Sequence, residues 1–374
     1  MQRSLKILLV STSYPEGEKD WRGRFIVSML NSLSGVNTLD FTVWAPPGNL
    51  PNRITYAATA REAAWLKKLM QDGGIAHILR QSNVKAVTTV IALMYQLRQL
   101  YRRSSACNVF HVNWLQNALP MVGTRKPALI TVLGSDYGLL KLPLMTPLLR
   151  YIIRQRRCII APNAGWMVPL LEMKFGDIAK VHAIPFGVDG IWFDLERSVN
   201  WDEPEKWIVV SRLTIKKIGP LFEWGKTIFN GRRELHLFGP LQDSMTIPSW
   251  VNYHGPTHPK ELESVWFPKA MGIISLSNHD EGRPQVILEA MAAGLPVVAS
   301  HLPAHSDVIH DGVTGRLVQN EIEFSQAVTG LADPTTNQHI GAAAKKWLQD
   351  NVGTWADCAK RYERAYHELI ENHE

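Results

Sequence analysis

The stretch MGIISLSNHDEGRPQVILEAMAAGLPVVAS, residues 271–300, holds a strand, a loop, a helix and a second strand in that order. Its two ends, 271–277 and 295–300, are short apolar runs of the kind that form buried strands. Pro284 suits the first helical turn, because the N–H that proline lacks would have no partner there. Gly294 and Pro296 predict the end of the helix. The stretch therefore predicts one βαβ unit of a parallel sheet.

The same alternation recurs along the chain. Further runs expected to be strands lie at 5–12, 40–45, 108–112, 128–133, 158–162, 180–186, 206–213, 234–239 and 250–255. Strands that alternate with helices predict an α/β fold of parallel sheets covered by helices on both faces. Because one core rarely grows past ~250–300 residues, the 374 residues predict two such domains.

A segment rich in turn formers and charge, 187–207, suggests the linker between the domains. We expect an N-terminal domain over 1–189 and a C-terminal domain over 190–354. Residues 355–374 are expected to form a closing amphipathic helix, which can pack back on the N-terminal domain. Its apolar positions have helical spacing: Trp355, Cys358, Tyr362, Tyr366 and Leu369.

The composition excludes several classes of protein. With 45% hydrophobic and 20% charged residues, the chain is neither disordered nor fibrous. Three cysteines do not make a disulfide framework, which favours a reducing compartment. The N-terminal apolar run is too short for a signal sequence, and no window reaches the ~18 apolar residues of a membrane span. We therefore expect a cytoplasmic protein.

The charge is distributed unevenly. Residues 73–171 contain twelve basic residues and one acidic residue, a net charge of +11, whereas residues 172–374 carry −8. Two stretches, 90–103 and 139–157, combine leucine-rich faces with clustered cations. Basic amphipathic helices of this kind bind anionic membrane surfaces. The alternative is that both helices pack on the sheet with their cations in solvent.

Two carboxylates bracket the start of the helix in the 271–300 unit. Glu281 lies in the loop and Glu289 about a turn and a half into the helix. In a parallel sheet the loop after a strand faces the ligand crevice. Helix-start amides favour a phosphate, and carboxylates accept hydrogen bonds from sugar hydroxyls. The pattern suits a sugar nucleotide, while the alternative is that both carboxylates are solvated.

The segments EGRPQVILE and AMAAGLPVVAS together resemble the E-x7-E signature of the family 4 retaining glycosyltransferases. Other segments resemble the same family: SRLTIKK (211–217), IPFGVD (184–189), HDGVTGRLV (310–318), LFGP (237–240) and YHGPTH (253–258). The resemblance implies the GT-B fold, two Rossmann-like domains that face a central cleft. It implies that the N-terminal domain binds the acceptor and the C-terminal domain binds the nucleotide sugar.

The resemblance also implies roles in the C-terminal domain. Glu281 is expected to act in catalysis through the donor sugar hydroxyls, and Glu289 to hold the ribose. Arg212 and Lys217 are expected to bind the diphosphate, with Lys216 as the adjacent competitor for the role of Lys217. Further residues are expected to contact the donor: Gly239, Gly282, Arg283, Gln285 and Val286.

In the N-terminal domain the resemblance is weaker. Gly23 is expected in a loop whose backbone approaches the donor diphosphate. LGSDYG (133–138) resembles a segment that commonly contains HGSD, which places Ser135 and Asp136 at the cleft. Leu133 replaces the histidine of that segment, and His111 is the candidate substitute. Asp136 and His111 are therefore candidate catalytic residues.

The chemistry that the resemblance implies is transfer of a hexose with retention, by same-face attack of the acceptor. The sequence contains no Asp-x-Asp pair to hold a divalent ion, so we expect neither a metal nor another cofactor. The expected donor is a UDP- or GDP-sugar. The expected acceptor is a glycan or a polyprenyl-linked glycan, in cell-surface polysaccharide or glycolipid synthesis at the cytoplasmic face of the membrane.

Two alternative functions stay open. The same fold also suits a sugar-nucleotide epimerase or hydrolase. The sequence pI of about 9.1 suggests a nucleic-acid-binding protein. Against the latter, the cations alternate with leucines and no nucleic-acid motif is present, so no nucleic-acid partner is expected.

Overall fold

The computed structural model describes residues 4–17, 20, 22–80, 84–134, 136–279 and 281–371. The chain forms two compact units. Unit 1 comprises Met1–Phe186 and Trp355–Glu374, and unit 2 comprises Gly187–Thr354. The first unit thus ends at Phe186, and the C-terminal helix belongs to it.

Unit 1 is built on a seven-stranded parallel sheet. The strand order is β3-β2-β1-β4-β5-β6-β7. The strands are β1 (Leu5–Val10), β2 (Leu39–Trp44), β3 (Thr55–Tyr56), β4 (Val109–Asn113), β5 (Ala128–Val132), β6 (Cys158–Pro162) and β7 (Lys180–Val181). The central strands are fully buried, because helices cover both faces of the sheet.

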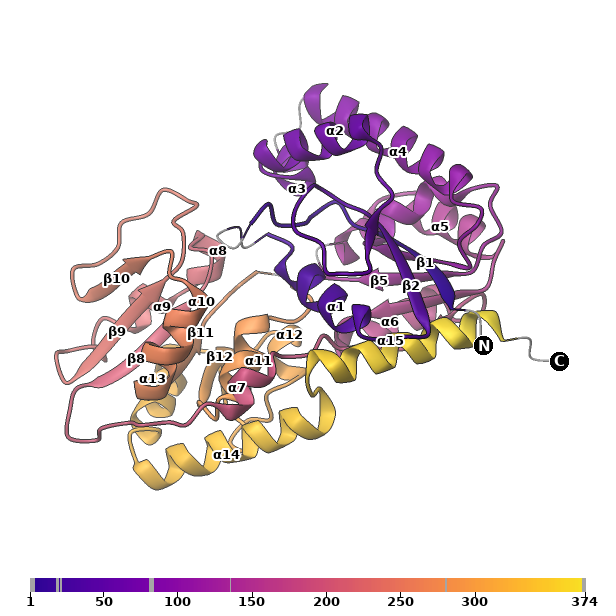
Figure 1. Cartoon of the computed structure of the whole chain (residues 1–374). Helices are drawn as coiled ribbons and strands as arrows, with labels where there is room; N and C mark the ends of the chain where they lie inside the picture. The colour runs from indigo at the N-terminus through magenta and orange to yellow at the C-terminus, as the bar shows by residue number, and fades with distance from the viewer. Residues whose placement is uncertain are drawn as a thin grey trace. The chain divides into compact units, whose positions relative to one another are not determined.

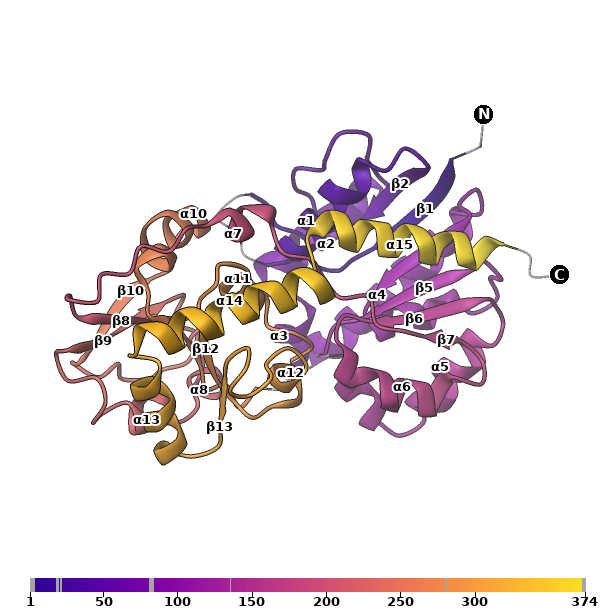
Figure 2. The ribbon, with the colours of Figure 1, turned by 90° about the horizontal axis from the view of Figure 1, so that it is seen from below.

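The helices of unit 1 enclose two apolar cores, one on each face of the sheet. One core holds residues of α2 (Ala60–Gln71), α3 (Ile75–Arg80), α4 (Val84–Arg103), α5 (Met145–Ile153), α6 (Val168–Phe175) and the 3₁₀ turns η1 (Leu115–Met121), η2 (Tyr137–Lys141) and η3 (Gly165–Met167). The other holds α1 (Arg24–Ser34) and α15 (Trp355–Ile370). In Figures 1 and 2, α15 lies beside α1 along this sheet. Its buried side, which includes Trp355, Tyr362 and Tyr366, completes the second core.

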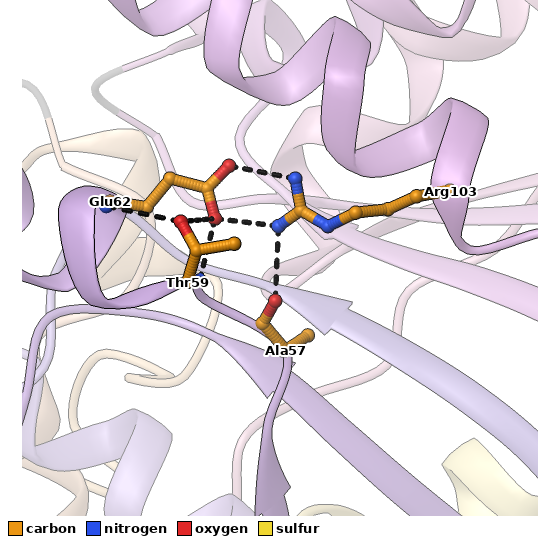
Figure 3. A network of polar contacts seen from close by, with 4 residues as sticks. All are labelled: Ala57, Thr59, Glu62 and Arg103. Carbon is orange, nitrogen blue, oxygen red and sulfur yellow. Dashed lines mark hydrogen bonds and ion pairs between the residues drawn. The ribbon is translucent and has the colours of Figure 1, made fainter.

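A polar network fixes α2 to the end of α4. Thr59 and Glu62 form a capping box at the start of α2. The Glu62 carboxylate also accepts from Arg103 at 2.6 and 2.8 Å, and Arg103 donates to the Ala57 carbonyl oxygen at 3.0 Å (Figure 3). The cap and the ion pair therefore share one carboxylate.

Unit 2 is built on a six-stranded parallel sheet of order β10-β9-β8-β11-β12-β13. The strands are β8 (Glu205–Val210), β9 (Arg233–Phe238), β10 (Val251–Gly255), β11 (Gly272–Ser275), β12 (Val297–Ser300) and β13 (Arg316–Val318). The helices are α7 (Gly190–Asp194), α8 (Ile215–Ile218), α9 (Leu221–Trp224), α10 (Pro259–Glu261), the π-helical turn η4 (Leu262–Trp266), the 3₁₀ turn η5 (Phe267–Lys269), α11 (Gln285–Ala292), α12 (Pro303–Ser306), α13 (Glu321–Gly330) and α14 (Pro334–Asn351).

The predicted βαβ unit is confirmed. Strands β11 and β12 pair in parallel, with Ile273 opposite Val297, and α11 connects them. Pro284 is the N-cap of α11, one residue before the helix. The expectation of two Rossmann-like parallel-sheet domains is therefore correct. Among the described helices, none combines the length and the hydropathy that crossing a membrane requires.

Candidate functional site

Three loops of unit 2 follow neighbouring strands. They come after β8, β11 and β12, which are adjacent in the sheet, and begin with residues 211, 276 and 301. Because all three strands run parallel, their carboxyl ends lie at one edge of the sheet. Most of the residues predicted to bind the donor come from these loops or from the helices that follow them.

The short helix α8 packs directly on the loop after β11. Gly219 ends α8 with a φ of 55°, and a Cβ there would lie 2.0 Å from the Leu276 carbonyl oxygen. A side chain at this position would therefore collide with backbone. The Asn278 N–H donates to the Lys216 carbonyl oxygen at 2.7 Å. These contacts fix α8 against the loop that carries Glu281.

Lys217 and Glu281 form an ion pair at the centre of this arrangement. The Nζ–Oε2 distance is 2.5 Å, and the side chains are 13% and 18% exposed. The other carboxylate oxygen of Glu281, Oε1, is buried and has no hydrogen-bond partner among the described residues. Lys216 is exposed, so the structure separates the two lysines that the sequence left as competitors.

Arg283 and Gln285 use their side chains within unit 2. The Arg283 guanidinium pairs with Asp307, which follows α12, and both side chains are mostly buried. Its Nε and one terminal nitrogen are buried and find no acceptor in the described part of the chain. Gln285 donates to the Gly187 carbonyl oxygen at 2.8 Å. Gln285 therefore holds the start of α11 to the first residue of the unit.

The remaining predicted residues lie around this centre or on α11. Gly282 is buried, Val286 packs on the apolar core, and Glu289 is half-buried one turn after Gln285. Gly239 has a φ of 129°, and a Cβ there would lie 1.7 Å from the Ser211 carbonyl oxygen. This glycine lets the loop after β9 approach the residue before Arg212.

His279 reports on the charges that surround it. Burial lowers the pKa of its imidazole, and the charges of Lys217, Arg212 and Lys216 lower this pKa further, while Glu281 raises it. The ring is therefore neutral. Sequence reasoning missed His279, although its place in the loop after a central strand could have indicated it.

A second histidine that the sequence did not assign to the site is His305 in α12. It is completely buried, and its Nδ1 lies 2.8 Å from the Ser300 carbonyl oxygen. Its Nε2 is buried and has no partner among the residues that the structure describes. The Arg283–Asp307 pair ties the end of α12 to the loop that contains Glu281.

In unit 1, His111 lies inside the core. It is fully buried, with Nδ1 2.6 Å from the Tyr366 hydroxyl and Nε2 2.8 Å from Thr131 Oγ1. Burial lowers the pKa of His111 to about 3, which keeps the ring neutral. These contacts give His111 a structural role in holding α15 to the sheet, and its catalytic role stays a prediction.

Asp136 is also enclosed by the protein. It is 4% exposed, and its two carboxylate oxygens accept from the backbone N–H groups of Leu115 at 3.0 Å and Leu133 at 2.9 Å. Burial raises the pKa of Asp136 to about 6, although these N–H groups act in the opposite direction. Asp136 thus ties together the loops after β4 and β5. Ser135 lies outside the described residues.

Gly23 precedes α1 with a φ of 72°. A Cβ there would lie 2.8 Å from Ser13 Oγ and 2.9 Å from the Ser13 carbonyl oxygen. The loop after β1 therefore needs glycine at this position for its own packing. A contact of the Gly23 backbone with the donor stays a prediction.

The helices formed by the two basic stretches expose apolar side chains beside their cations. On α4, four residues spaced by about a helical turn are 61–79% exposed: Val84, Val87, Ile91 and Tyr95. Between η2 and α5 and on α5 itself, the exposed apolar residues are Leu142, Leu144, Leu148 and Tyr151, flanked by exposed Lys141 and Arg154. We call these eight apolar residues the exposed apolar face of unit 1.

Two cations of the second stretch do not belong to that face. Arg156 is buried and donates to the carbonyl oxygens of Ile152 and Met121 and to Thr124 Oγ1. Arg157 donates to the carbonyl oxygen of Glu371 at 2.6 Å. Both therefore stabilise unit 1 itself.

Residues 231–333 match the family model described as "Glycosyl transferases group 1". Over 129 residues the chain is 33% identical to the D-inositol 3-phosphate glycosyltransferase of Corynebacterium diphtheriae. The aligned residues make up 34% of this chain and 29% of that protein. Over 108 residues it is 31% identical to the probable sucrose-phosphate synthase of Thermosipho melanesiensis, covering 28% of this chain and 25% of that protein. The matched segments thus span less than a third of each relative.

Solved structures match nearly the whole chain at low identity. The sucrose-phosphate synthase of Thermosynechococcus elongatus has a TM-score of 0.69 at 17% identity, over 98% of this chain and 99% of that one. Anabaena HepE in complex with UDP has a TM-score of 0.70 at 13% identity, over 98% and 100%. The fold of this chain is therefore GT-B, and it carries a segment similar to group 1 glycosyltransferases.

Proposed function

We propose that this protein is a retaining glycosyltransferase of family 4 that transfers a hexose from a UDP- or GDP-sugar to a glycan or lipid-linked acceptor. The observation that carries the proposal is the mostly buried Lys217–Glu281 pair at the carboxyl ends of the central strands of unit 2. A cation there suits a diphosphate, and a carboxylate with one unpartnered oxygen suits sugar hydroxyls. HepE, which shares the fold, is described in complex with UDP and with UDP-glucose.

The first step is an exchange of partners at Lys217. The diphosphate takes the place of Glu281 beside the ammonium group, and Arg212 adds a second positive charge. Glu281 is then released and accepts hydrogen bonds from hydroxyls of the sugar. Glu289 accepts hydrogen bonds from the ribose. Before the donor binds, the ion pair with Glu281 already holds Lys217 where the phosphate will lie, so the lysine side chain moves little on binding.

The transfer itself separates charge. The bond between the anomeric carbon and the phosphate oxygen breaks, and a bond from the acceptor oxygen to the same face of that carbon forms. The departing phosphate oxygen accepts the proton of the acceptor hydroxyl. Arg212 and Lys217 stabilise the negative charge that the leaving nucleoside diphosphate gains, so the proposal includes no metal and no other cofactor.

The acceptor side of the proposal rests on unit 1. Its exposed apolar face lies in the segment of net charge +11, which suits an anionic membrane surface. Each cation near such a surface contributes about 1 kcal/mol of binding. We therefore place the protein peripherally on the cytoplasmic face of the membrane, acting on membrane-linked glycans of cell-surface polysaccharide or glycolipid synthesis.

A donor panel tests the catalytic proposal. Thermal unfolding is followed with UDP-, GDP- and ADP-glucose and GDP-mannose, and we expect a rise in Tm with one nucleotide class. A panel in which no nucleotide sugar changes the Tm would contradict the proposal. Rapid breakdown or epimerisation of the donor without acceptor would instead favour the hydrolase or epimerase.

Vesicle sedimentation tests the membrane proposal. At low salt we expect binding to phosphatidylglycerol vesicles, and weaker binding when Ile91 and Tyr95 are both changed to Glu. Ile322→Glu is the matched control, because Ile322 is 70% exposed on unit 2. Equal sedimentation of the parent and the α4 variant would contradict membrane docking through this face.

A further inference from the structure

The completely buried His305 keeps one ring nitrogen without a partner. Its Nδ1 lies 2.8 Å from the Ser300 carbonyl oxygen and 3.4 Å from Ser300 Oγ. A carbonyl oxygen can only accept a hydrogen bond, so Nδ1 carries the proton. The hydroxyl of Ser300 donates to the Ser277 carbonyl oxygen at 2.6 Å, which leaves its oxygen able only to accept from the ring. In the neutral ring, Nε2 is therefore a bare acceptor.

Two contacts join the segment that carries His305 to the loop after β11. Ser300 holds the start of that loop through Ser277, and the Arg283–Asp307 pair holds its end to the residue after α12. His305 lies between these two attachments in the chain. Burial lowers the pKa of His305, although its hydrogen bond to the Ser300 carbonyl oxygen and the charge of Glu281 raise it. The ring is thus neutral, and both attachments join its segment to the loop that carries Glu281.

We propose that Nε2 of His305 accepts a hydrogen bond from a hydroxyl of the transferred sugar, which makes His305 a specificity-determining residue of the donor site. This inference rests on the proposed function. A buried acceptor without a partner is unfavourable, and native proteins rarely keep one unless a ligand or water completes it. Described residues of the protein do not supply the donor to Nε2.

The chemistry of the nitrogen selects the part of the ligand that it meets. A bare lone pair repels the oxygens of an ionised diphosphate, which have no proton to donate. A sugar hydroxyl donates readily. His305 therefore hydrogen-bonds to the sugar, while Lys217 pairs with the phosphates.

The test compares two substitutions that separate the ring nitrogens. In His305→Asn the amide can still donate to the Ser300 carbonyl oxygen, but nothing replaces Nε2. In His305→Gln the longer amide reaches the position of Nε2 and offers an acceptor there. Calorimetric titrations with UDP and with UDP-glucose, and thermal unfolding of each variant, are the measurements.

We expect His305→Asn to bind UDP as the parent does and UDP-glucose about three- to tenfold more weakly, the effect of one hydrogen bond. We expect His305→Gln to recover part of that loss. An unchanged affinity of His305→Asn for UDP-glucose, or an equal loss for UDP and UDP-glucose, would overturn the inference. If the donor panel selects GDP, the same titrations use GDP and the GDP-sugar; if the parent binds no nucleotide sugar of the panel, the proposed function is wrong and this inference falls with it.

A second measurement keeps the test decisive if either variant fails to fold. The parent is titrated with UDP-glucose analogues that each lack one sugar hydroxyl. We expect one analogue to bind more weakly by the same three- to tenfold factor, and a folded His305 variant not to distinguish it from UDP-glucose. Equal affinities of the parent for all analogues would overturn the inference.

Discussion

The two units share a parallel-sheet construction, but their candidate site residues differ in how far the protein itself pairs them. In unit 1, both ring nitrogens of His111 and both carboxylate oxygens of Asp136 are paired within the protein. In unit 2, Glu281 Oε1 and His305 Nε2 are buried and find no partner among the described residues. Unit 1 also keeps buried polar atoms without a partner among the described residues, such as Asn113 Oδ1. The difference therefore concerns the candidate site residues: those of unit 2 leave hydrogen bonds for a ligand to make.

The outer surfaces of the units differ as well. The segment with a net charge of +11 lies within unit 1 and includes its exposed apolar face, whereas residues 187–354, which form unit 2, carry −6. Unit 1 therefore has the surface that suits a large anionic partner. Unit 2 has the enclosed polar groups that suit a small ligand.

The largest effect that this contrast predicts is on turnover. Glu281→Ala removes the carboxylate that positions the sugar, and we expect kcat to fall by about 10²–10³-fold. Glu289→Ala should mainly weaken nucleotide binding. Steady-state kinetics with the donor found by the panel measures both, with Glu321→Ala, an exposed residue of α13, as control. Transfer by both variants at the parent rate would show that the site is misplaced.

The next largest effect concerns stability. His111→Ala leaves a cavity and leaves Tyr366 and Thr131 without their partner, so we expect a loss of about 3 kcal/mol in the free energy of unfolding. Nucleotide affinity should stay at the parent value in the folded variant. Urea unfolding and titration with UDP are the measurements. A stable variant with lost activity would restore the catalytic role of His111.

The pH dependence of stability gives a second test of the structural role of His111. The pKa of His111 is about 3 in the folded protein and near 6.5 when unfolded, so the unfolded chain takes up a proton that the folded state does not. The stability from this group is present above pH 6.5 and is lost as the pH falls toward 3. Between pH 6.5 and 5 the loss is about 2 kcal/mol. Between these pH values the free energy of unfolding of the parent should fall more steeply than that of His111→Asn. Parallel curves of unfolding free energy against pH would contradict the prediction.

The smallest predicted effect lies in the cap of α2. Thr59→Ala removes the side chain that accepts from the Glu62 N–H, and we expect a loss of about 1 kcal/mol in unfolding free energy. Thr88→Ala is the matched control, because Thr88 is exposed on α4, and it should change the free energy of unfolding less. Neither variant should alter nucleotide binding by unit 2, and an altered affinity would mean that the units do not divide the roles as proposed.

The sequence predicted the repeated βαβ pattern well, because apolar strands and the Pro284 and Gly294 boundaries are local signals. The short strands β3 and β13 were missed, since segments of two and three residues carry little periodic signal. Arg156 was grouped with the membrane-facing cations, but its packing on η1 through Met121 could not be seen in the spacing.

The site was predicted only in outline. Glu281 and Lys217 were identified through the resemblance, but the choice between Lys216 and Lys217 depended on the direction of α8, which only its packing on Leu276 decides. His279 was missed because a single histidine in a loop has no pattern around it, and His305 was missed because α12 is too short to show one. Their role depends on burial and on unpartnered atoms, which are properties of the folded chain.

The central claim is that Lys217 binds the phosphates of a nucleotide sugar at the carboxyl edge of unit 2. Calorimetric titration of UDP into the parent, Lys217→Ala and Lys216→Ala tests it directly. The account predicts that Lys217→Ala loses at least about tenfold in affinity, as expected for a charge-assisted hydrogen bond, while Lys216→Ala binds as the parent does. Equal affinities for UDP in all three proteins would contradict the account.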